Sequence, residues 1–262
     1  MSFDRALLGR TGVEVRRLGL AASYGAPAGA VEQAFDRGVN YFYWGSLRRG
    51  AFGNGLRALA SRRDRFLLVT QSYSRIASLI GPSLERALRA LRFDYTDALL
   101  LGLWNGAPPP RILDACHKLH ARGLVRYLAV STHNRPLAAR LASDPQFDIF
   151  HVRYNAVHRG AEREVFREWP AQNPPGLVSF TATSWRQLLG HRRIPAGEKV
   201  PSATDCYRFV LTQPAVNVCM AGPADGAQLQ QALEALDRGP MTEEELRWMR
   251  RIGDAIYGKP RA

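Results

Sequence analysis

The chain has 262 residues, and its 36 Lys and Arg against 23 Asp and Glu give a formal net charge of +13. A hydrophobic content of 46% is enough to bury a full core, which excludes a disordered chain and a small disulfide scaffold. The cysteines, Cys116, Cys206 and Cys219, are spaced for neither a disulfide ladder nor a zinc site. We therefore expect a cytoplasmic protein without a metal.

The positive charge is almost entirely arginine and is scattered along the chain. Because there is no basic block and no interleaved aromatic platform, we expect no nucleic-acid partner and assign the arginines to solubility and anion attraction. No stretch approaches the roughly 20 apolar residues of a membrane span, and the N-terminus lacks an apolar signal region, so no membrane partner is expected. The oligomeric state is left open.

The predicted elements open with a short β-hairpin over residues 7–21 and continue as alternating strands and helices. Each strand is a short run enriched in Val, Leu, Ile, Phe or Tyr. The eight expected strands are Leu18–Ala22, Val39–Trp44, Phe66–Gln71, Asp97–Leu101, Val125–Ser131, Phe147–Tyr154, Gly176–Ala182 and Val216–Ala221.

Several of the intervening segments have helical periodicity. Pro82–Leu91 places its leucines on one face, and Cys116 belongs to the apolar stripe of another helix, which favours packing over metal binding. Thr242 and Glu245 have the spacing of a capping box, which predicts a final helix running to about Tyr257.

Eight strand–helix units in about 240 residues predict a (β/α)8 TIM barrel, formed by one domain over residues 1–262. A doubly wound open sheet is the alternative, but its glycine fingerprint is missing. Gly50, Gly53 and Gly55 have the wrong spacing and follow the second strand, so we interpret them as a loop and helix start.

The chemistry of such a barrel lies where the C-termini of the strands meet their loops. These positions are rich in aromatic, arginine and amide side chains, and they lack the paired carboxylates and the lysine that glycoside hydrolysis and Schiff-base chemistry need. No G-x-S-x-G elbow of an esterase is present. The set predicts a pocket for a small aromatic or anionic molecule, with Trp44, Gln71, Trp104, Arg153, Asn155 and Trp185 as its lining.

Acid–base groups are also present at these strand ends. Tyr43 or Tyr73 is a candidate acid, His133 a candidate base, and Arg48 a candidate for holding a carboxylate or lowering the pKa of a neighbouring phenol. The alternatives remain that His133 is a surface residue at a helix N-terminus, that Arg48 is a surface arginine, and that some of the aromatic side chains only plug the barrel mouth.

The segments LLGRTGVEVRRLGLA, AFDRGVNYF, DALLLGL, YLAVSTHN and PAVNVCMAGPADGAQLQQAL resemble, in order, the aldo-keto reductase family. The resemblance implies a (β/α)8 barrel that reduces carbonyls with a nicotinamide cofactor, NADP(H) or NAD(H). It also implies that the family's aspartate, tyrosine, lysine and histidine tetrad is replaced by Tyr43, Arg48, Gln71 and Gly102.

The resemblance further assigns cofactor positions. Ser131 and Thr132 would stand for the residues that bind the nicotinamide carboxamide, His151 for a glutamine, and Phe180 for the tyrosine that stacks on the ring. The arginine that binds the 2′-phosphate would fall at Ala224. Ordinary carbonyl reduction and tight NADPH binding are therefore not expected.

Two functions follow from these observations. The first is an atypical aldo-keto reductase-like enzyme with a rebuilt active site, an oxidoreductase if the family's class persists, acting on a small molecule. The second is a non-catalytic barrel that binds a small molecule or a partner, because the whole tetrad is replaced.

Overall fold

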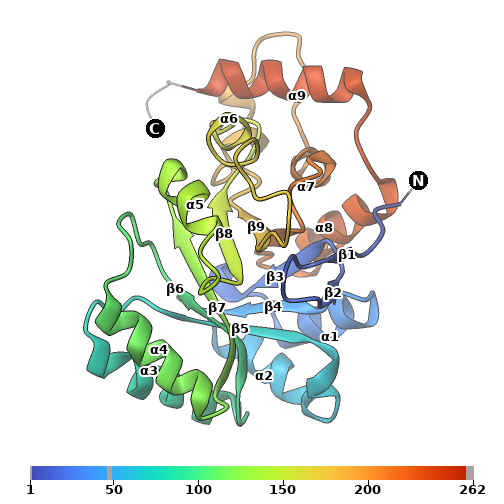
Figure 1. Cartoon of the computed structure of the whole chain (residues 1–262). Coiled ribbons are helices and arrows are strands. Elements are labelled where there is room, and N and C mark those ends of the chain that lie inside the picture. Colours follow the sequence, from blue (N-terminus) through green and yellow to red (C-terminus); the bar gives the residue numbers. More distant parts are fainter. Residues whose placement is uncertain (1, 46–48, 258–262) are drawn as a thin grey trace.

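The computed structural model describes residues 2–45 and 49–257, and its centre is a closed barrel of parallel strands (Figure 1). The strands follow one another around the barrel in the order β10-β3-β4-β5-β6-β7-β8-β9. They are β3 (Leu18–Ala21), β4 (Tyr41–Trp44), β5 (Leu67–Ser72), β6 (Thr96–Leu101), β7 (Val125–Thr132), β8 (Ile149–Arg153), β9 (Gly176–Phe180) and β10 (Val218–Ala221). The eight predicted strands and the TIM-barrel fold are confirmed.

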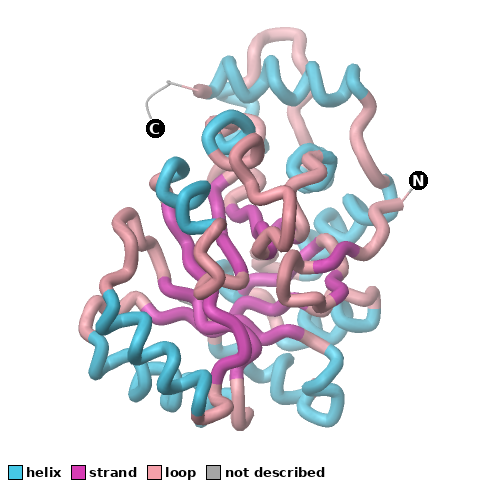
Figure 2. Tube along the Cα trace, in the orientation of Figure 1, coloured by secondary structure: helices cyan, strands magenta, loops and turns pink. Residues whose placement is uncertain are grey.

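Helices surround this barrel, as Figure 2 shows. They are α1 (Ala28–Asp36), α2 (Gly50–Ala58), α3 (Ala77–Leu91), α4 (Pro110–Ala121), α5 (Arg135–Ala142), α6 (Ala161–Glu164), α7 (Ala203–Thr212), α8 (Gly226–Arg238) and α9 (Glu243–Ile256). The predicted capping box is present at the start of α9, where Glu245 N donates to Thr242 Oγ1 and Thr242 N donates to Glu245 Oε2.

A short antiparallel hairpin lies at one end of the barrel, as predicted. It pairs β1 (Ala6–Leu7) with β2 (Glu14–Val15). Leu8 and Val15 are fully buried in the cluster that fills the barrel interior, and Tyr127 Oη donates to Thr11 O. The hairpin therefore closes the end where the strands begin, which leaves the other end for a site.

Successive side chains of each strand point alternately into the barrel and toward the helices, which gives an inner core and an outer core. In β4, Tyr41 and Tyr43 belong to the interior cluster, whereas Phe42 and Trp44 belong to the cluster between strands and helices. In each strand, only the side chains that face the barrel interior can reach a site at the barrel mouth.

Two helix boundaries differ from the prediction. Helix α3 begins at Ala77, five residues before Pro82, because Ile80 is fully buried and extends the apolar stripe by one turn. The three glycines interpreted as a loop and helix start all lie within α2, which begins at Gly50, so the helix start is confirmed and the loop is wrong. A Cβ atom on Gly55 would lie 2.5 Å from Ala28 O, so this glycine allows α2 and α1 to pack closely.

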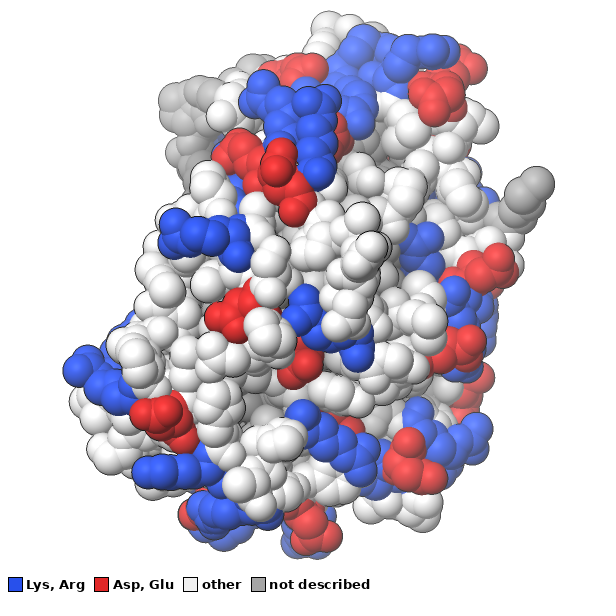
Figure 3. All heavy atoms as spheres, in the orientation of Figure 1, with Lys and Arg blue, Asp and Glu red and all other residues white. Residues whose placement is uncertain are grey.

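The cysteines are free and buried, and Cys116 lies on the apolar face of α4 as expected. Lys and Arg side chains are interspersed with Asp and Glu on the face seen in Figure 3. No helix in the described part of the chain has the length and apolar character needed to cross a membrane.

Candidate functional site

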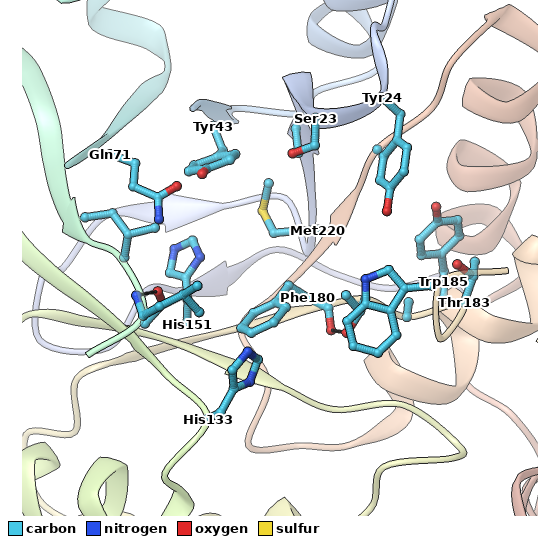
Figure 4. A pocket seen from close by; sticks show the side chains of 18 of the residues that line it. Ser23, Tyr24, Tyr43, Gln71, His133, His151, Phe180, Thr183, Trp185 and Met220 are labelled. Atoms are coloured by element: carbon cyan, nitrogen blue, oxygen red, sulfur yellow. Dashed lines mark hydrogen bonds between the residues drawn. The ribbon is translucent and has the colours of Figure 1, made fainter. Parts of the chain in front are cut away.

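A pocket of about 340 Å³ opens at the carboxyl ends of the barrel strands, where a (β/α)8 fold carries its chemistry (Figure 4). All eight strands, or the loops that follow them, contribute to its lining, and helix α7 adds Tyr207. The lining is Ala21, Ser23, Tyr24, Tyr43, Gln71, Tyr73, Leu100, Leu103, Ser131, His133, His151, Phe180, Thr181, Ala182, Thr183, Trp185, Tyr207, Met220 and Gly222.

The structure brings together most of the residues that the sequence singled out. Of the candidate acid–base groups, Tyr43, Tyr73 and His133 line the pocket, and so do Ser131, His151, Phe180, Gln71 and Trp185. Figure 4 shows Tyr43 and Gln71 on one side of the pocket, with Phe180, His133 and Trp185 opposite. Their location is established, and their roles remain predictions.

Two predicted residues do not line the pocket because the strand pleat turns them outward. Trp44 packs in the outer core under Arg49, and its Nε1 donates to Arg49 O. Thr132 Oγ1 accepts from Asn134 N and contacts Asn105 Oδ1 at 3.3 Å, so its hydroxyl shapes the loop before α5.

Three further residues predicted for the substrate pocket also lie outside it. Trp104 is buried in the outer core, with the Arg75 guanidinium 4.0 Å above its ring. Asn155 is fully buried in loop contacts. Arg153 lies over the Trp185 ring and lines a separate, arginine-rich hollow beside α6 and α9. The predicted Arg48 lies outside the described residues.

Among the described residues, the pocket lining contains no Asp, Glu, Lys or Arg. Burial lowers the pKa of His151 to about 3, so its imidazole is neutral at physiological pH. Burial and the nearby Arg153 charge also lower the pKa of His133. The described lining is therefore uncharged near pH 7, which favours a neutral ligand over the anionic one that the sequence also allowed.

A hydrogen bond crosses the barrel directly beneath this pocket. Tyr41 Oη lies 2.8 Å from His151 Nε2, and both side chains are buried. They come from β4 and β8, which are four positions apart around the eight-stranded barrel and so face each other. The ring of Tyr43 lies above, with its centroid 6.3 Å from that of His151.

Two glycines make room for three of the lining side chains. A Cβ atom on Gly45 would lie 2.5 Å from the phenol oxygen of Tyr43, so the Tyr43 ring folds over this glycine. A Cβ atom on Gly102 would collide with Gln71 Nε2 and would lie 2.7 Å from Tyr73 Cδ1. Gln71 and Tyr73 thus occupy the space that any side chain at position 102 would need.

The loop after β9 is strained where it borders the pocket. Thr181, Ser184, Trp185 and Arg186 all have positive φ angles, which non-glycine residues rarely adopt. Asn155 Nδ2 donates to Thr181 O, and Ser184 N donates to the same oxygen. Such strain persists only where surrounding contacts hold it, and it concentrates at functional sites.

Sequence reasoning missed several lining residues. Ser23 and Tyr24 follow the end of β3, and Met220 lies in β10, so the rule about strand ends and inward parity could have found all three. Tyr207 comes from the middle of α7. No strand-end signal marks that position.

The described residues fit only part of a nicotinamide cofactor. Phe180 offers an aromatic surface at the pocket wall, and its ring centroid lies 5.8 Å from that of His133. Ser131 and His151 offer polar groups in the same pocket. Cationic side chains are strong partners of phosphates, and the described pocket lining supplies none. Ala224, at the expected 2′-phosphate position, is exposed and has only a methyl side chain. No group of three His, Cys, Asp or Glu that could hold a metal occurs within residues 2–45 and 49–257.

Comparison of the sequence with family models places the chain in a known family. The model of the aldo/keto reductase family matches residues 25–182, and the chain belongs to this family, which is oxidoreductase-like. The resemblance inferred from the sequence is therefore confirmed.

The individual relatives match the chain over a short segment or at low sequence identity. L-galactose dehydrogenase from Arabidopsis thaliana is 30% identical over 113 residues, and the match spans only 35% of each chain. The solved structures of aldo-keto reductase AKR11C1 from Bacillus halodurans superpose with TM-scores of 0.77 (holo form) and 0.74 (apo form). Both are 20% identical over 97% of each chain, which supports the fold alone.

Proposed function

We propose that this chain is an atypical aldo-keto reductase whose active site has been rebuilt around a small, uncharged, aromatic or apolar molecule. The observation that carries the proposal is the fit between new side chains and glycines: Gln71 and Tyr73 fill the space above Gly102, and Tyr43 folds over Gly45. Random decay of a tetrad would not be expected to leave two such matched packings beside a well-formed pocket.

The chemistry of the rebuilt site is limited by its groups. Gln71 carries no charge, so it cannot stabilise a phenolate as the family lysine would. Tyr43 remains a phenol at the pocket floor that can donate a proton to a ligand oxygen. His133, kept neutral by its lowered pKa, can accept one at the rim.

The oxidoreductase class then depends on a redox cofactor, and NADP(H) or NAD(H) is the one that the family implies. Titration of the purified chain with NADPH and NADH, followed by fluorescence, tests this directly. Micromolar binding would support an oxidoreductase. It would contradict the inference that the lack of cationic side chains weakens binding of the cofactor's phosphates.

The phenol is tested by substitution. If a carbonyl panel gives turnover, Tyr43→Phe should lower kcat by about 10² to 10⁴, the usual contribution of a positioned proton donor. Tyr95→Phe is the control, because Tyr95 precedes β6 at the opposite end of the barrel. Turnover that survives both Tyr43→Phe and His133→Ala would remove the acid–base assignment.

A second function is a non-catalytic barrel that binds the same class of molecule. The specific observation in its favour is the uncharged pocket lining, which offers a cofactor phosphate no cationic side chain among the described residues. Binding of a small aromatic molecule without cofactor binding and without turnover would select this function.

A further inference from the structure

The buried pair Tyr41 and His151 determines what the pocket floor offers a ligand. Within the described chain, Tyr41 Oη has one hydrogen-bond partner, His151 Nε2. Gly19 makes room for the tyrosine, since a Cβ atom there would lie 3.0 Å from Tyr41 Cδ1. The phenol is therefore held in place in the barrel interior.

The direction of this bond follows from its surroundings. The phenol hydrogen has no acceptor other than Nε2 among the described atoms, and a buried hydroxyl left without an acceptor destabilises the fold. Tyr41 therefore donates, and Nε2 accepts with its lone pair. A neutral imidazole carries one hydrogen, which must then reside on Nδ1.

The other ring nitrogen is available to the pocket. His151 lines the pocket, and no hydrogen bond to Nδ1 exists within the described chain. Nδ1 is also absent from the enclosed polar atoms that lack partners, a group that does include Gln71 Oε1. The floor thus offers the pocket an N–H donor at His151.

We infer that Tyr41 is a positioning residue that fixes His151 in the Nδ1–H tautomer, so that the pocket floor presents a permanent hydrogen-bond donor to an acceptor oxygen of the ligand. The inference rests on the proposed function, because it uses the same pocket. It also narrows the ligand to an uncharged molecule with an acceptor oxygen, such as a carboxamide or a ketone.

The tautomer can be measured without a ligand. In the full-length chain labelled with ¹⁵N-histidine, long-range ¹H–¹⁵N spectra distinguish the two neutral tautomers, and His151→Gln identifies the signal. The wild type should show Nδ1–H at pH 7, and Tyr41→Phe should shift the population toward Nε2–H. The matched control Tyr127→Phe removes a phenol that donates to Thr11 O at the hairpin end, and it should change nothing.

Binding of benzamide, benzoate and toluene tests the donor role. Benzamide should bind the wild type best, and Tyr41→Phe should weaken it about fivefold, the effect of one hydrogen bond. An Nε2–H signal in the wild type, or an unchanged tautomer in Tyr41→Phe, would overturn the positioning role. If the tautomer is as inferred but no probe binds, the positioning role survives while the donor role and the proposed ligand class are overturned.

Discussion

The buried His151 should make the stability of the fold depend on pH. In the folded chain, burial lowers the pKa of His151 to about 3, whereas an unfolded histidine has a pKa of about 6.5. Between these values the unfolded state binds more protons, so acid favours unfolding. The stability is complete above pH 6.5 and is lost progressively as the pH falls toward 3.

The size of this loss follows from the two pKa values. When the pH falls from 7 to 5, His151 alone should lower the free energy of unfolding by about 2 kcal/mol. The limiting slope is about 1.4 kcal/mol per pH unit. The groups facing the ring from β4 are the phenols of Tyr41 and Tyr43, and burial raises the pKa of Tyr41.

Urea unfolding at pH 7 and pH 5, followed by tryptophan fluorescence, measures the effect. From pH 7 to pH 5, the free energy of unfolding of His151→Gln should fall by about 2 kcal/mol less than that of the wild type. This comparison holds whatever the stability of the variant at pH 7. His117→Gln removes an exposed histidine on α4 and should behave like the wild type. Equal pH dependence in the wild type and His151→Gln would refute the buried, neutral imidazole.

Three further predictions concern the helices around the barrel. Gly253→Ala should lower the free energy of unfolding by about 2–3 kcal/mol, because the new Cβ would collide with backbone atoms of Ala156 in the loop after β8. Gly29→Ala, in an open position of α1, should be neutral or stabilise by up to about 1 kcal/mol. Thr242→Ala should cost about 1 kcal/mol by removing the cap of α9. Urea denaturation measures all three, and equal stability of both glycine variants would contradict the close contact at Gly253.

Most of the barrel could be predicted because its signals are local. Short apolar runs identified all eight strands, and the Thr242 pattern located the start of α9. The start of α3 could not be placed, because the proline resembled a first helical residue and only tertiary packing reveals the burial of Ile80. Gly55 of α2 was likewise explained by its contact with the neighbouring helix α1 rather than by its own sequence.

The site was predictable where strand position alone decides it. Trp44 and Thr132 could have been excluded by the pleat, which sends alternate side chains to opposite faces. Tyr207 could not have been found, because it reaches the pocket from a helix. The Tyr41–His151 bond joins residues 110 positions apart, so it requires knowledge of which strands face each other.

The uncharged lining has a kinetic consequence for a chain of net charge +13. Long-range steering acts on charged ligands and weakens as salt screens the field. A neutral ligand would enter this pocket by unassisted diffusion, and its affinity would hardly change with ionic strength. Anions drawn by the surface arginines would instead stay on the outside, since the described walls of the pocket offer them no partner. The arginine-rich exterior and the binding site would thus respond to different solutes.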